Sequence, residues 1–277
     1  MSDLDFTRPA QSDVYKSDVA RQFFRDNGKP QAVAAGSVLF VENAAGKAMY
    51  FLSSGEIALT RGGKPLDVIK AGEVLGEMSV LTAEPRSATA TARSACEVIE
   101  LDGGAFLGAI QKTPDFALML LAILIKRLRL ALVMQKLGKG QATTTIDRLP
   151  TSGAVFDSDL LNDLTSNFPG HPPVYQPKNA VIMREGEAGI FMYVVIDGAV
   201  RIVVNDNVIE VVRPGGVFGE MALVDQSKRA ATAAAATDCN LLAINRNDFM
   251  RLIRTNPAFG VSLLRALASR LRNTGRR

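Results

Sequence analysis

Two pairs of residues in the sequence combine groups that could bind a phosphate-containing ligand. Glu77 lies nine residues before Arg86, and Glu220 lies nine residues before Arg229. A guanidinium is planar and permanently charged, so it can bind two phosphate oxygens at once. A carboxylate would repel phosphate and must face another part of the ligand. The glycine directly before each glutamate lets backbone approach a ligand closely, and a turn that opens a short helix there would point N–H groups at an anion.

Both pairs belong to an internal repeat. When the chain is laid on itself with an offset of 143 residues, its halves match without a gap over roughly ninety positions. Glycine, proline, arginine and cysteine all stay in register: Asp67–Met78 falls on Glu210–Met221, Cys96 on Cys239, Phe106 on Phe249, Pro114 on Pro257 and Arg127 on Arg270. The protein is therefore a duplication.

Each half has the same expected layout. A lead-in helix comes first, at Asp13–Asn27 and Asp157–Asn167. Short apolar runs broken by glycine follow and indicate strands of a sandwich or jelly roll. A closing helix begins at Pro114 or Pro257, each preceded by a capping residue, and runs to about residue 135 or 272. We predict a mainly β fold of two tandem jelly rolls with flanking helices, divided into domains at 1–140 and 141–277.

The segments Gly72–Thr89 and Gly215–Thr232 resemble the phosphate-binding cassette of the cyclic nucleotide-binding domain family, as in catabolite activator proteins and protein kinase A regulatory subunits. The resemblance covers residues 30–135 and 175–273. It implies that each arginine binds the cyclic phosphate and each glutamate accepts a hydrogen bond from the ribose 2′-hydroxyl. The residues expected to bind ligand are Gly76, Glu77, Met78, Ser79, Arg86, Ser87, Gly219, Glu220, Met221, Ala222, Arg229 and Ala230.

The residue after the cassette arginine indicates the base. In the family, alanine there goes with adenine, and threonine or serine is associated with guanine. Ala230 therefore favours cAMP in the second half, whereas Ser87 leaves cAMP, cGMP and a cyclic dinucleotide open in the first. The family's closing helix also supplies a residue that covers the base, and the sequence does not identify it.

The composition argues against several other functions. The single histidine, His171, lies in a proline-rich linker, and Cys96 and Cys239 are isolated, so we expect no catalytic triad, no metal site and no cofactor. We expect a binding protein and not an enzyme. The longest apolar stretch, Phe116–Ile125, has about half of the ~20 residues that a membrane span needs. Two cysteines without a signal peptide favour a reducing, cytoplasmic setting.

Three functions stay open on the sequence. The first is a nucleotide-controlled adaptor that binds an effector protein or a second copy of itself. The second is an assembly module with degenerate pockets, in which each Glu–Arg pair is only a structural ion pair. The third is a DNA regulator that uses the basic tail, although we expect neither a helix-turn-helix nor a kinase-inhibitor segment.

The first closing helix has more apolar surface than its own domain requires. Residues 116–134 are apolar on nearly every side, whereas one apolar stripe would cover the sandwich. The surplus must contact either the same helix of a second chain or the second half of the same chain. We predict a homodimer through residues 118–134, sensitive to glutamate at Leu124 or Leu128, in which cAMP changes the orientation of the helix.

Overall fold

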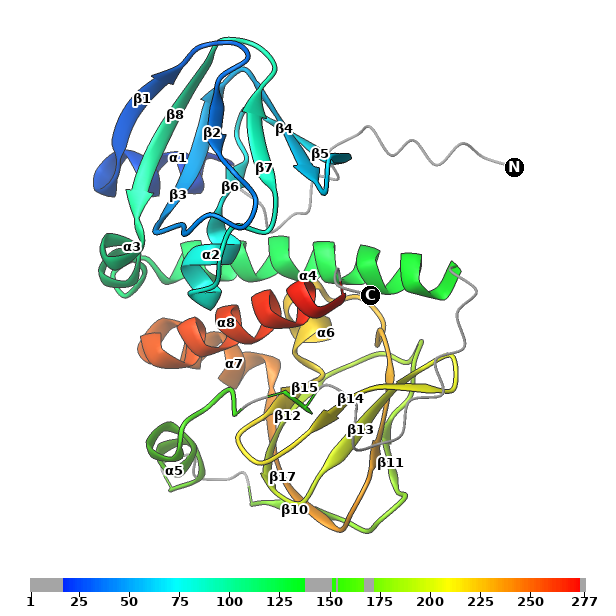
Figure 1. Ribbon diagram of the computed structural model, residues 1–277. Helices are drawn as coiled ribbons and strands as arrows, with labels where there is room; N and C mark the ends of the chain where they lie inside the picture. Colours follow the sequence, from blue (N-terminus) through cyan, green and yellow to red (C-terminus); the bar gives the residue numbers. More distant parts are fainter. Residues whose placement is uncertain (1–16, 138–150, 153, 167–171, 275–277) are drawn as a thin grey trace.

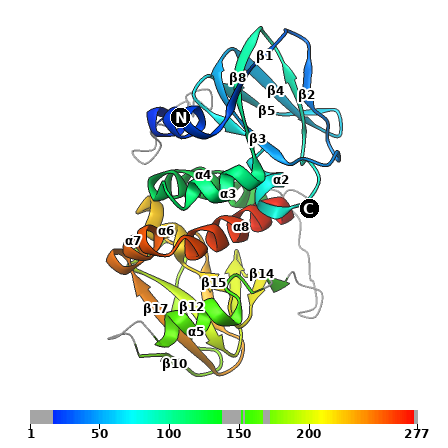
Figure 2. The ribbon, with the colours of Figure 1, turned by 90° about the vertical axis from the view of Figure 1, so that its left-hand side faces the viewer.

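The computed structural model describes residues 17–137, 151–152, 154–166 and 172–274. Two β-sandwiches lie on opposite sides of a central pair of long helices, α4 (Pro114–Leu137) and α8 (Pro257–Thr274), as Figure 1 shows. Figure 2 shows the same three layers after a turn of 90°. The predicted boundary near residue 140 lies outside the described residues.

The first sandwich consists of two four-stranded antiparallel sheets, in the orders β1-β8-β3-β6 and β2-β7-β4-β5. Its strands are β1 (Lys29–Val33), β2 (Val38–Phe40), β3 (Ala48–Ser54), β4 (Glu56–Arg61), β5 (Lys64–Lys70), β6 (Val74–Leu75), β7 (Thr89–Ala92) and β8 (Cys96–Asp102). Its helices before α4 are α1 (Ser17–Asn27), α2 (Glu77–Thr82) and α3 (Gly103–Ile110).

The second sandwich repeats this topology, with the sheet orders β10-β17-β12-β15 and β11-β16-β13-β14-β9. Its strands are β9 (Thr151–Ser152), β10 (Val174–Gln176), β11 (Val181–Met183), β12 (Phe191–Asp197), β13 (Val200–Val204), β14 (Asn207–Val212), β15 (Val217–Phe218), β16 (Thr232–Ala235) and β17 (Cys239–Asn245). Its other helices are α5 (Ser158–Ser166), α6 (Glu220–Asp225) and α7 (Arg246–Thr255). The added strand β9 pairs with β14 in parallel, and the other pairs are antiparallel.

The strands follow from the alternation seen in the sequence. Along β13, Val200, Ile202 and Val204 are buried while the residues between them are half-buried, which is the period of two that a strand requires. Gly198 links β12 to β13 at a φ of 82°, and a Cβ there would lie 2.2 Å from the Asp238 carbonyl oxygen. Only glycine fits such a turn. The predicted fold class, two jelly-roll domains each followed by a closing helix, is confirmed.

The two closing helices pack against each other in parallel. They begin at the predicted prolines, and a Cβ on Gly260 near the start of α8 would lie 3.9 Å from the Cβ of Ala117 near the start of α4. Ala117 and Gly260 are equivalent in the repeat, so the pair has an approximate two-fold relation. The chain thus contains within itself a pairing of two equivalent domains.

This pairing decides between the two partners that the sequence left open for the first closing helix. The surplus apolar side chains of α4 are covered by α8, α6 and α7 of the same chain. Leu124 is 0% exposed and Leu128 is 4% exposed, so neither is accessible to a second chain. The prediction that Leu124 and Leu128 form a contact between two chains is therefore wrong. The homodimer itself remains a prediction. Among the described residues, every helix is too short or too polar to span a bilayer.

Candidate nucleotide-binding sites

Each half contains one cavity beside its cassette. The cavity of the second half has a volume of about 540 Å³, and that of the first half has a volume of about 400 Å³. The twelve residues expected to bind ligand all line these cavities: Gly76, Glu77, Met78, Ser79, Arg86 and Ser87 in the first, and Gly219, Glu220, Met221, Ala222, Arg229 and Ala230 in the second. The duplication therefore yields two sites of the same design.

The turn at the start of each cassette positions the site, because the strand before it is followed by a glycine with a left-handed backbone. Gly76 follows β6 with a φ of 79°, and Gly219 follows β15 with a φ of 81°. A Cβ at either position would lie 2.7 Å from Nη1 of the cassette arginine of the same half. Glycine is needed here both for the turn and for the close approach of the guanidinium.

The Arg86 guanidinium lies buried at the wall of the first cavity. Arg86 is 4% exposed, and its Nη1 donates to the Gly76 carbonyl oxygen at 3.0 Å and to Ser79 Oγ at 2.7 Å. Its Cζ stacks 4.3 Å from the centroid of the Phe40 ring. Its buried Nε makes no hydrogen bond to any described residue. Burial lowers the pKa of Arg86, and a buried cation with a free donor favours an anion beside it.

Arg229 occupies the equivalent place with one change of partner. Its Nη1 donates to the Gly219 carbonyl oxygen at 2.7 Å and its Nη2 to the Phe191 carbonyl oxygen at 2.6 Å. Ala222 replaces the serine hydroxyl of the first site. The Nε of Arg229 is also buried and makes no hydrogen bond in the described part of the chain. Burial is again the main reason why the pKa of this arginine is lowered.

The glutamates of the two cassettes do not form their salt bridges with the cassette arginines. Glu77, 2% exposed, forms an ion pair with Arg127 of α4. Glu220 accepts a hydrogen bond from Arg270 Nη1 of α8 at 2.9 Å. The ion-pair reading of the sequence, which joined each glutamate to its cassette arginine, is therefore wrong about the partner. The carboxylate of Glu77 is the main reason why the pKa of Arg127 is raised.

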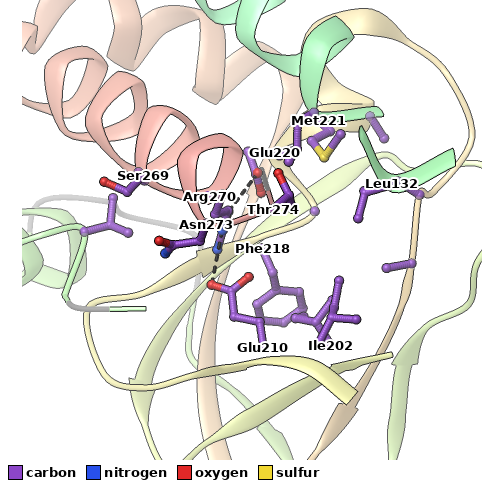
Figure 3. A pocket seen from close by; sticks show the side chains of 18 of the residues that line it. Leu132, Ile202, Glu210, Phe218, Glu220, Met221, Ser269, Arg270, Asn273 and Thr274 are labelled. Atoms are coloured by element: carbon purple, nitrogen blue, oxygen red, sulfur yellow. Dashed lines mark hydrogen bonds and ion pairs between the residues drawn. The ribbon is translucent and has the colours of Figure 1, made fainter. Parts of the chain in front are cut away.

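The second site adds a further carboxylate to this contact. Arg270 Nε donates to Glu210 Oε1 at 3.1 Å, so Arg270 lies between Glu210 and Glu220, as the dashed lines in Figure 3 show. Burial alone would lower the pKa of Arg270, but the two carboxylates outweigh it and raise the pKa. The closing helix of each half is thus tied directly to its cassette.

Sequence reasoning missed these helix arginines as site residues. Arg127 and Arg270 were visible as a matched pair in the repeat, but nothing in their spacing pointed to the glutamates.

The remaining walls of the second cavity are apolar on the sheet side, with Ile202 and Phe218, and polar on α8, with Asn273 and Thr274 (Figure 3). Each site can therefore bind an anion at its arginine and a hydroxyl at its glutamate beside an apolar group.

Comparison with known proteins agrees with this geometry. The family model of the cyclic nucleotide-binding domain matches residues 30–113 and 173–256. The cyclic AMP receptor protein of Thermus thermophilus is 37% identical over 101 residues, which are 35% of this chain and 47% of that protein. The cAMP-dependent protein kinase regulatory subunit of Eremothecium gossypii is 42% identical over 76 residues, 27% of this chain and 17% of that protein.

A solved structure described as cAMP-bound PfPKA-R is 20% identical, covers 87% of this chain and 84% of its own, and has a TM-score of 0.34. The chain spans less than half the length of the two curated relatives. The family model matches more than half of the chain, once in each half, over segments that contain the two cassettes. The chain belongs to the cyclic nucleotide-binding domain family and contains two copies of that domain.

Proposed function

We propose that the protein is a cyclic nucleotide sensor that binds one nucleotide in each half, with cAMP as the ligand of the second. One observation carries the proposal. Each cavity is bordered by a buried arginine whose Nε has no hydrogen-bond partner among the described residues and by a buried glutamate held by the closing helix. An assembly module would have no reason to keep this arrangement in both halves.

The groups match a cyclic nucleotide one by one. A cyclic monophosphate has a single negative charge, and the cassette arginine supplies one positive charge for it. The glutamate accepts a hydrogen bond from the ribose 2′-hydroxyl. The apolar walls contact the base. The names of the relatives, a cyclic AMP receptor protein and a cAMP-dependent kinase regulatory subunit, support cAMP, and Ala230 supports it in the second site.

The signal passes through the bond between cassette and closing helix. The ribose hydroxyl must donate to the same carboxylate that Arg127 or Arg270 contacts. Binding therefore changes the hydrogen bonding and geometry at that contact and shifts α4 or α8. A shift in either helix changes the α4–α8 pair, which would be the two-state element that a switch requires.

The partner that receives the signal is an effector protein or a second copy of the chain. The buried face of α4 is used within the chain, so a partner would contact other surfaces, such as the exposed side chains of Leu130 and Val133 on α4. A cytoplasmic setting, expected from the two cysteines, remains a prediction.

Calorimetric titration of the purified chain with cAMP, cGMP and cyclic dinucleotides tests the proposal. We expect saturable heat with cAMP, and little with 5′-AMP, which has the same base and sugar but an open, doubly charged phosphate. If the folded protein releases no heat with any cyclic nucleotide at millimolar concentration, the assembly module replaces the sensor.

A further inference from the structure

Each cavity is completed by the closing helix of the other half. The first cavity is lined by Leu271, Arg272 and Thr274 of α8, although α8 belongs to the second domain. The second cavity is lined by Leu128 and Leu132 of α4. The two sites are therefore built from both halves of the chain.

Two equivalent arginines make this crossing. Arg129 on α4 and Arg272 on α8 are related by the repeat offset of 143. Arg129 Nη1 donates to the Lys228 carbonyl oxygen at 3.0 Å, and Arg272 Nη2 donates to the Pro85 carbonyl oxygen at 2.6 Å. Lys228 and Pro85 directly precede the cassette arginines of the opposite halves. Each helix thus contacts the cassette of the other domain beside its phosphate-binding residue.

Arg129 and Arg272 differ in whether their guanidinium nitrogens have hydrogen-bond acceptors. Each of the three guanidinium nitrogens of Arg129 has an acceptor, because Asp225 accepts from Nε and Nη2 and the Lys228 carbonyl oxygen accepts from Nη1, and Arg129 does not line the second cavity. Arg272 is 8% exposed and lines the first cavity. Its Nε forms an ion pair with Glu84 Oε2 at 2.7 Å, but neither the buried Nε nor the buried Nη1 makes a hydrogen bond to any residue that the structure describes. An unsatisfied buried donor of a charged group calls for an acceptor.

The first cavity is also lined by more arginines relative to carboxylates than the second. The first cavity is lined by four arginines and two carboxylates: Arg61, Arg86, Arg127, Arg272, Asp67 and Glu77. The second is lined by three of each: Arg229, Arg265, Arg270, Asp157, Glu210 and Glu220. The lining of the first cavity therefore includes two more arginines than carboxylates, although Arg272 is also paired with Glu84, which does not line the cavity.

We propose that Arg272 is a ligand-binding residue of the first site, so that the cyclic nucleotide bound there is held by both domains. This inference rests on the proposed function. A guanidinium has only donors, so Arg272 Nη1 would donate to an acceptor atom of the nucleotide. Ligand in the first site would then link the first cassette to α8, and the first site would require the second domain.

The test uses a chain whose second site is disabled by Arg229→Ala, so that titrated cAMP or cGMP reports the first site alone. We expect Arg272→Gln in this background to raise the Kd of the first site at least tenfold. Glu84→Gln is the matched control, because it removes the ion pair of Arg272 but keeps the guanidinium, and it should change the Kd less than threefold. In the reciprocal Arg86→Ala chain, Arg272→Gln should leave the Kd of the second site within twofold. Thermal melting confirms that each variant is folded.

Three results overturn the inference and leave the sensor function in place. The first is that Arg272→Gln leaves the Kd of the first site unchanged. The second is that Glu84→Gln weakens that site as much as Arg272→Gln does. The third is that Arg272→Gln weakens both sites equally. In the last two cases Arg272 only holds the cassette or the helix pair in position. If the unsubstituted chain binds no cyclic nucleotide, the proposed function fails and the inference fails with it.

Discussion

Truncation of Leu124 to alanine tests whether the two closing helices pair within one chain. Leu124 is 0% exposed at the centre of α4, and its equivalent in the repeat, Leu267, is also 0% exposed on α8. Removing three carbons from such a site loses their transfer free energy and leaves a cavity, which costs about 2–5 kcal/mol. A chain of this size loses roughly 2–4 °C in Tm per kcal/mol, so we expect Tm to fall by about 4–20 °C. Calorimetric melting with light scattering measures stability and mass together.

Val133→Ala is the matched control, because Val133 lies on the same helix and is 48% exposed. Its free energy of unfolding should change by no more than the ~0.5 kcal/mol typical of surface substitutions. The reasoning is refuted if Leu124→Ala melts like Val133→Ala. It is also refuted if the unsubstituted protein has the mass of a dimer that Leu124→Ala converts into a fully stable monomer, because α4 would then pair between chains.

Three further predictions concern the sites and the pH. Arg86→Ala and Arg229→Ala should each remove one binding event at a cost of about 2–4 kcal/mol, or about 30- to 1,000-fold in Kd, measured by calorimetry; two unchanged events in either variant would contradict this. In the Arg86→Ala chain the second site should prefer cAMP, and Ala230→Thr should shift the preference toward cGMP by about tenfold, or ~1.4 kcal/mol; a tenfold preference for cGMP before the substitution would contradict the base assignment. Burial raises the pKa of the Cys239 thiol and that of the Tyr193 hydroxyl above the ordinary values of these groups. Because the unfolded chain loses these protons first, the free energy of unfolding should fall as the pH rises above about 9, and urea unfolding that shows constant stability from pH 8 to 10.5 would refute it.

The parts of the fold that could be predicted are those encoded by local pattern. Glycine turns, strand alternation and the helix starts at Pro114 and Pro257 act over a few residues, and the structure has them where the sequence indicated. The cassette was equally accessible, because all of its residues lie within one short segment of each half. The repeat then provided a second, independent copy of every local signal.

The parts that could not be predicted depend on how distant segments pack. The partner of Glu77 is Arg127, fifty residues away, and Arg272 reaches Pro85 across 187 residues. Neither spacing has a local signature. The apolar surplus of α4 was correctly recognised, but burial against a second chain and burial against α8 remove the same surface from water, so hydrophobicity alone could not distinguish them.

The central claim is that one chain binds two cyclic nucleotides through the two cassette arginines. Equilibrium dialysis of labelled cAMP against the unsubstituted chain and the Arg86→Ala/Arg229→Ala double variant tests it most directly. The account predicts two cAMP molecules per unsubstituted chain at saturation and none on the folded double variant at the same concentration. No bound cAMP on the unsubstituted chain, or two bound on the double variant, would contradict it.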